Sequence, residues 1–322
     1  MAIVLYAESS EGKFKKVTFE LASYAKKIAE SLGTTVTAVA INTENVSELS
    51  KYGVDKVLQI TNSKLESFNA KAYSDCIKQA AINEKANLIL VSSTTDSLYL
   101  APLVAVSLEA GFASNVVGLP VSISPFQVKR TAFSNKAFAI SEMQTKCNVI
   151  SISKNSYGVF ENATNTSVEA FNPILSENDF GIKVTAIEKA SGKVTIADAD
   201  VVVSAGRGLK GPENWGMIEE LASVLGAATA CSKPVSDLGW RSHGEHVGQT
   251  GKPVAANLYI AVGISGAIQH IAGINSSKVK VVINTDAEAP FFKVADYGVV
   301  GDAFEIVPKL IEKLKVFKAQ NA

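Results

Sequence analysis

Short apolar segments alternate with amphipathic helical segments along most of this chain. In the first half, apolar runs at Ile3–Tyr6, Val36–Ile41, Lys56–Ile60 and Leu88–Val91 are separated by segments with helical spacing, such as Val17–Leu32. A strand–helix–strand repeat folds into a parallel sheet with helices on its faces. The length of 322 residues suits two domains. The sequence therefore predicts an α/β protein of two domains, each a mostly parallel, doubly wound sheet.

The pattern changes before the middle of the chain. Two β-rich runs, Gln127–Phe133 and Lys136–Ser141, flank a Ser134–Asn135 turn. This pattern predicts an antiparallel hairpin at the edge of the first sheet. Residues 155–181 are polar and show no period, and we place the domain boundary between residues 190 and 191.

The second half, residues 191–322, restarts the alternation. We expect helices near Asn214–Leu225 and Lys309–Phe317, and a long segment without period between them, Pro234–Pro253. Aperiodic loops of that length are usually functional. The predicted strands of this half are Val201–Val203, Ala227–Ala230, Leu258–Val262, Lys280–Ile283 and Tyr297–Val300.

Charge and cysteine usage exclude several classes of protein. Lys+Arg and Asp+Glu are equal at 31 each, so no overall field favours nucleic acid or an anionic membrane. Cys76, Cys147 and Cys231 form no Cys-x-x-Cys, and His243 and His246 have no further ligands at zinc spacing. No apolar run approaches the roughly 18 residues of a membrane helix. We expect a cytoplasmic protein with reduced thiols, without a metal, nucleic-acid partner or direct membrane insertion.

A polar residue closely follows each predicted strand of the second half: Arg207, Ser232, Ser265, Asn284 and Asp302. The carboxyl ends of parallel strands share one edge, where ligands bind in open α/β sheets. We therefore expect these five residues to converge on one site. For any single member, the alternative that it merely terminates a strand stays open.

The segment from Val247 to His270 combines a polar loop, a strand, a Gly-Ser turn and a helix start. Free backbone N–H groups and the positive end of a helix meet at that turn, which suits phosphate oxygens. Gln249 and Thr250 lie between glycines and offer uncharged donors. These features predict a site for a large nucleotide. His270 is either a ligand contact or a structural residue.

Residues Gly206–Gly211 match Gly-x-Gly-x-x-Gly after a strand, a spacing typical of dinucleotide sites. Pro212 and Glu213 delay the following helix, and Ser232-Lys233 stand where a ribose-binding acid would be expected. The motif is therefore weak evidence for NAD. No nucleophile–base pair or carboxylate pair is evident, which favours a carrier over an enzyme, with the chemistry supplied by its cofactor.

The motifs between Val201 and Pro308 resemble those of the alpha subunit of electron transfer flavoproteins. The resemblance implies one FAD, held mainly by the carboxy-terminal domain in a Rossmann-like fold, and a beta subunit that completes a heterodimer. It also implies electron passage from acyl-CoA dehydrogenases of fatty-acid beta-oxidation to a membrane quinone oxidoreductase. The motifs that carry the resemblance are Gly206–Gly208, Val247–Lys252, Leu258–His270, Ala289–Pro290 and Ala295–Gly298.

The resemblance also implies the residues that contact FAD. Thr250 would hydrogen-bond near flavin N5, and His270 would lie on the O2 side of the ring. Ser265 and its turn would hold the pyrophosphate, and Asn284 and Asp302 would face the adenosine end. The full set is Arg207, Ser232, Lys233, Val247, Gly248, Gln249, Thr250, Ser265, Gly266, Ala267, Ile268, Gln269, His270, Asn284, Asp302 and Ala303.

Lys233 departs from the family pattern, which usually has Arg at this position. Because Lys has no planar face to lie over the flavin, we expect its charge to act while the flavin potential shifts. Three alternatives stay open at this point: an electron-bifurcating flavoprotein, an NAD-linked oxidoreductase and a nucleotide-binding regulatory module.

Overall fold

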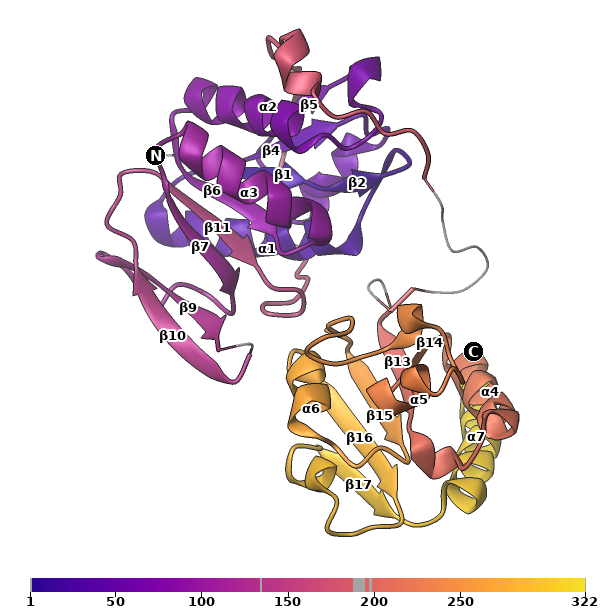
Figure 1. The fold of residues 1–322 in the computed structure, drawn as a ribbon. Helices are drawn as coiled ribbons and strands as arrows, with labels where there is room; N and C mark the ends of the chain where they lie inside the picture. The colour runs from indigo at the N-terminus through magenta and orange to yellow at the C-terminus, as the bar shows by residue number, and fades with distance from the viewer. Residues whose placement is uncertain (1, 134, 188–194, 197–198, 322) are drawn as a thin grey trace. The chain divides into compact units, whose positions relative to one another are not determined.

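The computed structural model describes residues 2–133, 135–187, 195–196 and 199–321. The chain forms two compact units, which separate after Ile187 (Figure 1). The predicted domain boundary between residues 190 and 191 lies outside the described residues. Within the described residues, no helix combines the length and apolarity needed to cross a membrane.

The amino-terminal unit is built on a ten-stranded sheet in the order β10-β9-β7-β11-β6-β1-β4-β5-β12, with β8 paired to β9. Strands β1, β4, β5, β6, β7, β11 and β12 pair in parallel, and β8, β9 and β10 are antiparallel. The strands are β1 (Ala2–Ala7), β4 (Val36–Ile41), β5 (Lys56–Ile60), β6 (Ala86–Ser92), β7 (Gly111–Val116), β8 (Ser122–Ile123), β9 (Phe126–Ala132), β10 (Ala137–Glu142), β11 (Asn148–Ile152) and β12 (Ser167–Ala170). The helices are α1 (Lys16–Leu32), α2 (Ala70–Asn83) and α3 (Thr95–Ser107), and β2 (Ser9–Ser10) and β3 (Lys13–Phe14) form a small hairpin.

Helices cover both faces of this sheet (Figure 1). On β1, Ile3 and Leu5 pack with α1, and Val4 and Tyr6 pack with α2 and α3. A central strand buried on both sides needs apolar residues at every position, which explains the continuous apolar run. Helix α1 matches the predicted helical segment Val17–Leu32 and ends before Gly33, whose φ of 61° suits glycine.

The predicted hairpin is confirmed as β9 and β10, which join the first sheet through β7. The prediction omits six described strands of this unit: β2, β3, β7, β8, β11 and β12. The segment 155–181 was interpreted as aperiodic, yet it contains β12, whose four residues are all exposed and pair with β5. Strand β7 begins at Gly111. An edge strand held by backbone bonds needs no apolar alternation, so β12 has no strong sequence pattern.

The carboxy-terminal unit has five parallel strands in the order β14-β13-β15-β16-β17. The α/β doubly wound fold is confirmed. In chain order the arrangement is 2-1-3-4-5, a flavodoxin-like form of that fold, and the order reverses between β13 and β15. The strands are β13 (Val201–Ala205), β14 (Ala228–Cys231), β15 (Leu258–Val262), β16 (Val279–Asn284) and β17 (Tyr297–Val300), and the helices are α4 (Gly216–Leu225), α5 (Lys233–Asp237), α6 (Ile268–Ile274) and α7 (Ala303–Gln320).

Helices α4 and α7 pack on one face of this sheet and α6 on the other (Figure 1). The last helix is longer than predicted. It begins at Ala303, because the Asp302 carboxylate accepts a hydrogen bond from the Phe304 N–H and caps it. The segment 234–253, predicted to lack regular structure, contains most of α5.

Candidate functional site

The carboxyl ends of the five parallel strands lie along one edge of the sheet and are tied together by backbone hydrogen bonds. Four backbone hydrogen bonds join neighbouring strand ends, so the loops after the strands form one continuous rim. The bonds run from Ser232 to Ala205, from Gly206 to Val262, from Gly263 to Ile283 and from Gly301 to Asn284, with N···O distances of 2.9–3.1 Å.

The loops after β13 and β15 cross in direct backbone contact where the strand order reverses. The Gly208 N–H donates to the Gly263 carbonyl at 3.1 Å. A Cβ on Gly206 would lie 2.3 Å from the Gly263 carbonyl oxygen, and one on Gly208 would lie 2.6 Å from the Gly263 Cα. The first two glycines of the Gly-x-Gly-x-x-Gly spacing are therefore required by backbone packing. The NAD interpretation is not needed to explain them.

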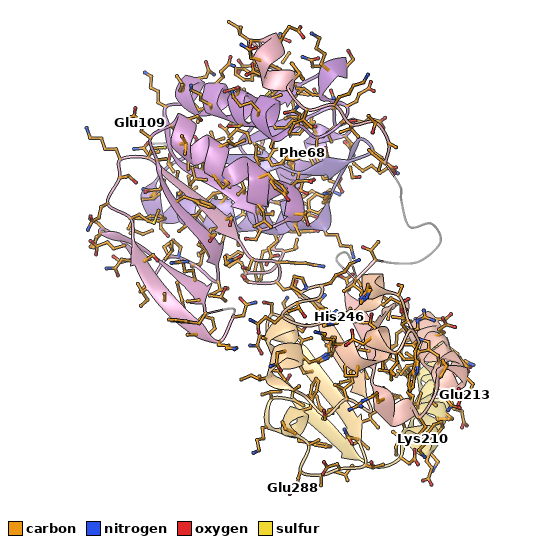
Figure 2. All side chains as sticks on the ribbon, viewed as in Figure 1. Phe68, Glu109, Lys210, Glu213, His246 and Glu288 are labelled. Carbon is orange, nitrogen blue, oxygen red and sulfur yellow. The ribbon has the colours of Figure 1, made fainter. Side chains whose placement is uncertain are left out.

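Neighbouring side chains fill the space around Gly211 and Lys210 in this turn. A Cβ on Gly211 would meet the Glu213 carboxylate at 2.1 Å (Figure 2 labels Lys210 and Glu213). Lys210 Nζ lies 3.8 Å from Asp302 Oδ2 and 4.9 Å from the centre of the Phe304 ring. Arg207, which precedes this turn, is exposed. Its guanidinium is available for a bidentate contact with a phosphate.

The loop that follows Val247 packs on α6. The Gln249 N–H donates to the Gln269 carbonyl at 2.7 Å. A Cβ on Gly273 would lie 2.6 Å from the Gly248 Cα, so only glycine allows helix and loop to approach this closely. This contact places the exposed side chains of Gln249 and Thr250 beside the start of α6.

The turn before α6 presents backbone donors. The N–H groups of Ser265, Gly266 and Ala267 make no hydrogen bond to any residue that the structure describes. Gly266 has a φ of 86°, and the Ser265 carbonyl accepts from the Phe291 N–H at 3.1 Å, which anchors the turn. Helix α6 has only seven residues, so its dipole adds little, and the loop amides are the main donors. Such open amides suit phosphate oxygens.

His270 lies in the first turn of α6, as the sequence predicts, but its side chain points inward. The residue is 6% exposed, and its Nε2 lies 2.9 Å from the Tyr259 hydroxyl. Burial lowers the pKa of His270 to about 4, so the ring is neutral at pH 7. In this structure His270 therefore supplies a neutral imidazole. Tyr259 was predicted only as a strand residue, since a tyrosine in an apolar run gives no functional signal.

Asn284 and Asp302 make internal contacts. The Asn284 amide donates to the Ile264 carbonyl at 3.1 Å, and its oxygen accepts from the Asp286 N–H at 3.0 Å. Asn284 therefore supports the turn that leads into Ser265. Asp302 caps α7, and Ala303 begins that helix and is buried.

On the other side of β13, Ser232 is buried at the end of β14 and Lys233 is exposed at the start of α5. The loop that follows α5 is held by an ion-pair network around Arg241. Arg241 pairs with Glu245 through two hydrogen bonds, at 2.8 and 2.9 Å, and with Glu219 at 3.1 Å.

His243 and His246 lie in the same loop. Among the described residues, no group of three or more His, Cys, Asp or Glu side chains is arranged to hold a metal ion, and these two histidines belong to no such group.

The donor set fits a flavin nucleotide in its chemistry. Open amides at Ser265–Ala267 suit the phosphates, and the exposed cations Arg207 and Lys233 offset negative charge. The uncharged Gln249 and Thr250 side chains and the buried His270, whose Nδ1 makes no well-formed hydrogen bond with the described residues, suit a polar ring.

Comparisons with known proteins identify the chain. Residues 3–175 match the family model for the electron transfer flavoprotein domain, and residues 195–275 match the model for the electron transfer flavoprotein FAD-binding domain. The electron transfer flavoprotein subunit alpha of Thermoanaerobacterium thermosaccharolyticum is 36% identical over 324 residues, covering 98% of each chain. The chain belongs to the family of electron transfer flavoprotein alpha subunits.

Two further relatives show how widely this alpha subunit family is used. The electron transfer flavoprotein subunit alpha of Bacillus subtilis is 34% identical, with 97% of each chain covered. Subunit LctC of the lactate dehydrogenase (NAD(+),ferredoxin) of Acetobacterium woodii is 31% identical, covering 97% of this chain and 77% of that protein. Alpha subunits of this family bind flavin, pair with a beta subunit and act as electron carriers.

Proposed function

We propose that this alpha subunit holds FAD on the strand-end rim of its carboxy-terminal unit and carries electrons from acyl-CoA dehydrogenases to a quinone oxidoreductase. The observation that supports the proposal most directly is the rim itself, where open amides, exposed cations and uncharged donors follow the carboxyl ends of neighbouring strands. The match to the FAD-binding model covers residues 195–275 of this unit.

The flavin supplies reversible electron transfer when it is bound, and the residues of the chain bind and orient it. The amides of Ser265–Ala267 hold phosphate oxygens, and Arg207 adds a charged contact. Gln249 and Thr250 donate hydrogen bonds to the ring. His270, neutral and buried, acts as a fixed polar group behind the loop that carries these donors.

The amino-terminal unit provides the contact with the beta subunit in this proposal. Helix α3 buries one face in the core, yet Leu98, Tyr99 and Val106 are 63, 66 and 79% exposed on the outside. An apolar patch of this kind marks an interaction surface. The beta subunit is its proposed occupant, because family members act as heterodimers.

An electron-bifurcating role is a second candidate. It is favoured by one observation, the 31% identity to a subunit of an enzyme named for both NAD(+) and ferredoxin. This candidate uses the same rim for FAD, and its other redox group lies in the partner.

Co-expression of the chain with its beta subunit tests the proposal. The purified complex should be yellow, contain FAD, and take up electrons from dithionite in two one-electron steps. A colourless complex that takes up no added flavin would overturn the proposal. Hydride transfer without bound flavin would support the NAD-linked alternative, and nucleotide binding without reversible reduction would support a regulatory module.

The acceptor test separates the two candidates. A carrier of the first type is reduced by an acyl-CoA dehydrogenase with its substrate and passes electrons to a quinone oxidoreductase. Reduction by NADH, coupled to reduction of ferredoxin, would instead assign the bifurcating role.

A further inference from the structure

His246 is a buried residue at the start of the turn that carries two of the proposed flavin donors (labelled in Figure 2). Its side chain belongs to a residue that is only 7% exposed. The His246 carbonyl accepts a hydrogen bond from the Lys252 N–H at 2.8 Å, and the next residue, Val247, donates to the Cys231 carbonyl at 3.0 Å. The backbone of His246 is therefore fixed to the far end of the turn and to the end of β14.

The turn itself is short and closed. The Gly251 N–H donates to the Gly248 carbonyl at 3.0 Å, which places Gln249 and Thr250 at the two corners of a β-turn. Both corner residues are exposed. The direction in which they point therefore follows from the position of the turn.

The imidazole of His246 packs against both glycines of this turn. A Cβ on Gly251 would lie 2.9 Å from His246 Cγ, and a Cβ on Gly248 would lie 3.6 Å from His246 Nε2. The two ends of the ring thus face the two residues that flank the corners. A shorter side chain in place of His246 would leave this space empty and remove the contact.

Helix α6 supplies the second support of the turn. The Gln249 N–H donates to the Gln269 carbonyl at 2.7 Å, and Gly273 brings the helix into backbone contact with Gly248. Gly248 therefore touches both the helix and the His246 ring. Of these two supports, the ring is the one that a single side-chain change removes.

We propose that His246 is a positioning residue, whose imidazole holds the turn from Gly248 to Gly251 so that Gln249 and Thr250 face the flavin ring. The inference deepens the proposed function and rests on it for the contact with flavin. The residue acts through the turn, and its own ring makes no contact with the cofactor in this proposal.

Hydrogen exchange of the full-length chain without flavin tests the structural half of the proposal. In His246→Ala the backbone amides of Gln249, Gly251 and Lys252 should exchange about tenfold faster, because the turn opens more often. His246→Gln, whose side chain reaches about as far as the imidazole, should restore most of the protection. Unchanged exchange in His246→Ala would overturn the proposal.

His243→Ala is the matched control, because His243 lies in the same loop and is exposed. Its Nδ1 lies 3.0 Å from the Ser236 hydroxyl and makes no contact that supports the turn. The turn amides should exchange as in the wild type. If His246→Ala does not fold, His246→Asn takes its place, and the expected order of protection is wild type, Gln, Asn. Equal protection in the Gln and Asn variants would then contradict the proposal.

Flavin titration of the heterodimer tests the functional half through coupling between residues. His246→Ala should weaken flavin binding about tenfold, the effect of misplacing one or two hydrogen-bond donors. In a background with both Gln249 and Thr250 changed to alanine, the same substitution should cost less than about threefold. In an Arg207→Ala background the full loss should persist. Equal losses in the two backgrounds would show that His246 does not act through the turn donors.

The two measurements separate this inference from the proposed function. A wild-type heterodimer that binds no flavin would reject the proposed function, and the exchange measurement would still decide whether His246 holds the turn. Faster exchange in His246→Ala with unchanged flavin affinity would reject the positioning role while the proposed function stands.

Discussion

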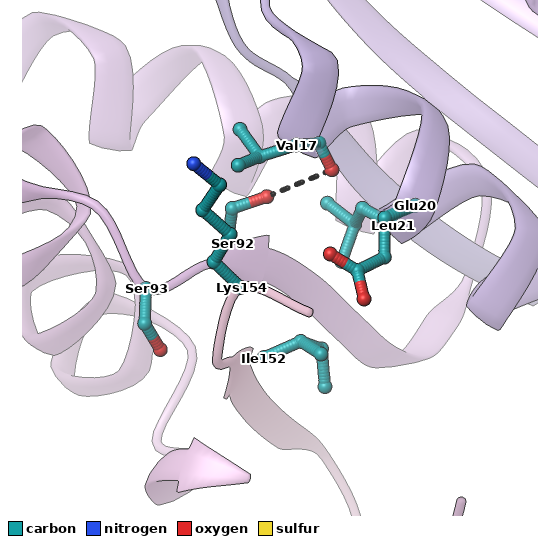
Figure 3. A pocket seen from close by; sticks show the side chains of 7 residues that line it. All are labelled: Val17, Glu20, Leu21, Ser92, Ser93, Ile152 and Lys154. Atoms are coloured by element: carbon teal, nitrogen blue, oxygen red, sulfur yellow. Dashed lines mark hydrogen bonds between the residues drawn. The ribbon is translucent and has the colours of Figure 1, made fainter. Parts of the chain in front are cut away.

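The two units share a doubly wound parallel sheet, and they differ in what lies at the carboxyl ends of their strands. In the amino-terminal unit the strand order reverses between β1 and β6. The Glu8 side chain, 1% exposed, occupies this point of the sheet edge. Its carboxylate forms an ion pair with Lys15 and accepts a hydrogen bond from Thr94 Oγ1 at 2.7 Å. Nearby, Ser92 Oγ donates to the Val17 carbonyl at 3.4 Å (Figure 3). The cavity there measures about 10 Å³, room for one water.

The backbone amides at the two edges show the same contrast. In the amino-terminal unit the Glu20 carboxylate accepts from the N–H groups of Asn155, Tyr157 and Gly158, each at 2.9 Å. In the carboxy-terminal unit the amides of Ser265–Ala267 have no such internal partner among the described residues. One fold thus makes a closed edge or an open one, depending on whether its own side chains satisfy the loop donors.

The glycine crossing is the feature whose loss should have the largest effect. Gly206→Ala places a Cβ 2.3 Å from the Gly263 carbonyl oxygen, so the two loops must separate. We expect a loss of roughly 4 kcal/mol in unfolding free energy and no flavin binding. Urea unfolding and flavin titration measure both. Gly216→Ala is the control, because a Cβ there meets nothing within 4 Å. If Gly206→Ala and Gly216→Ala had the same unfolding free energy and the same flavin affinity, the glycine contact would not be needed for the fold or the site.

The closed edge of the amino-terminal unit is expected to act on stability alone. Glu20→Ala leaves three amides unpaired and should cost about 3 kcal/mol of unfolding free energy, with flavin affinity unchanged. The exposed Glu66→Ala serves as the control. Urea unfolding of both variants measures the predicted loss of unfolding free energy. A loss of flavin affinity in folded Glu20→Ala would show that the two edges are not independent.

The buried His270 predicts a pH dependence of stability for the carboxy-terminal unit. Its folded pKa of about 4 lies below the usual 6.5, so the unfolded chain takes up the proton first. The contribution of the neutral His270 to the free energy of unfolding is complete above pH 6.5 and declines as the pH falls toward 4. By pH 5 the loss should reach about 2 kcal/mol. In His270→Asn, urea unfolding at pH 7 and pH 5 should lack this part of the decline. If the free energy of unfolding fell equally between pH 7 and pH 5 in the wild type and in His270→Asn, this prediction would be refuted.

The open edge is expected to act on flavin binding alone. Because the Arg207 side chain is exposed, Arg207→Ala should leave the free energy of unfolding unchanged and weaken flavin binding about tenfold. Urea unfolding and flavin titration measure the two quantities. Lys318→Ala, near the distal end of α7, is the control and should bind normally. A destabilised Arg207→Ala would mean that this edge also supports the fold.

Lys233→Arg should have the smallest effect and tests the departure from the family pattern. A planar guanidinium can lie over a ring, whereas an ammonium cannot. The flavin potentials should move by less than about 59 mV, equivalent to ~1.4 kcal/mol for one electron, with no change in stability. Stepwise reduction measures the potentials, and an unchanged pair would reject a special role for Lys233.

Several elements were predictable because their pattern is local. The apolar runs of β1, β4, β13 and β15 match strands buried on both faces, and Gly33 ends α1 by its own backbone freedom. The exposed strand β12 has no such pattern, and its pairing with β5 depends on a neighbour distant in the chain. The individual flavin contacts remain predictions.

The sequence by itself determined the alternation of strands and helices, the convergence of polar residues after parallel strands and the family resemblance, because periodicity and residue order are sufficient for these. Only the tertiary structure decided that Gly206, Gly208 and Gly263 meet backbone to backbone, and that His270 faces Tyr259 as a neutral ring. Close approach, burial and the direction of a hydrogen bond arise between residues far apart in the chain, and no local pattern records them.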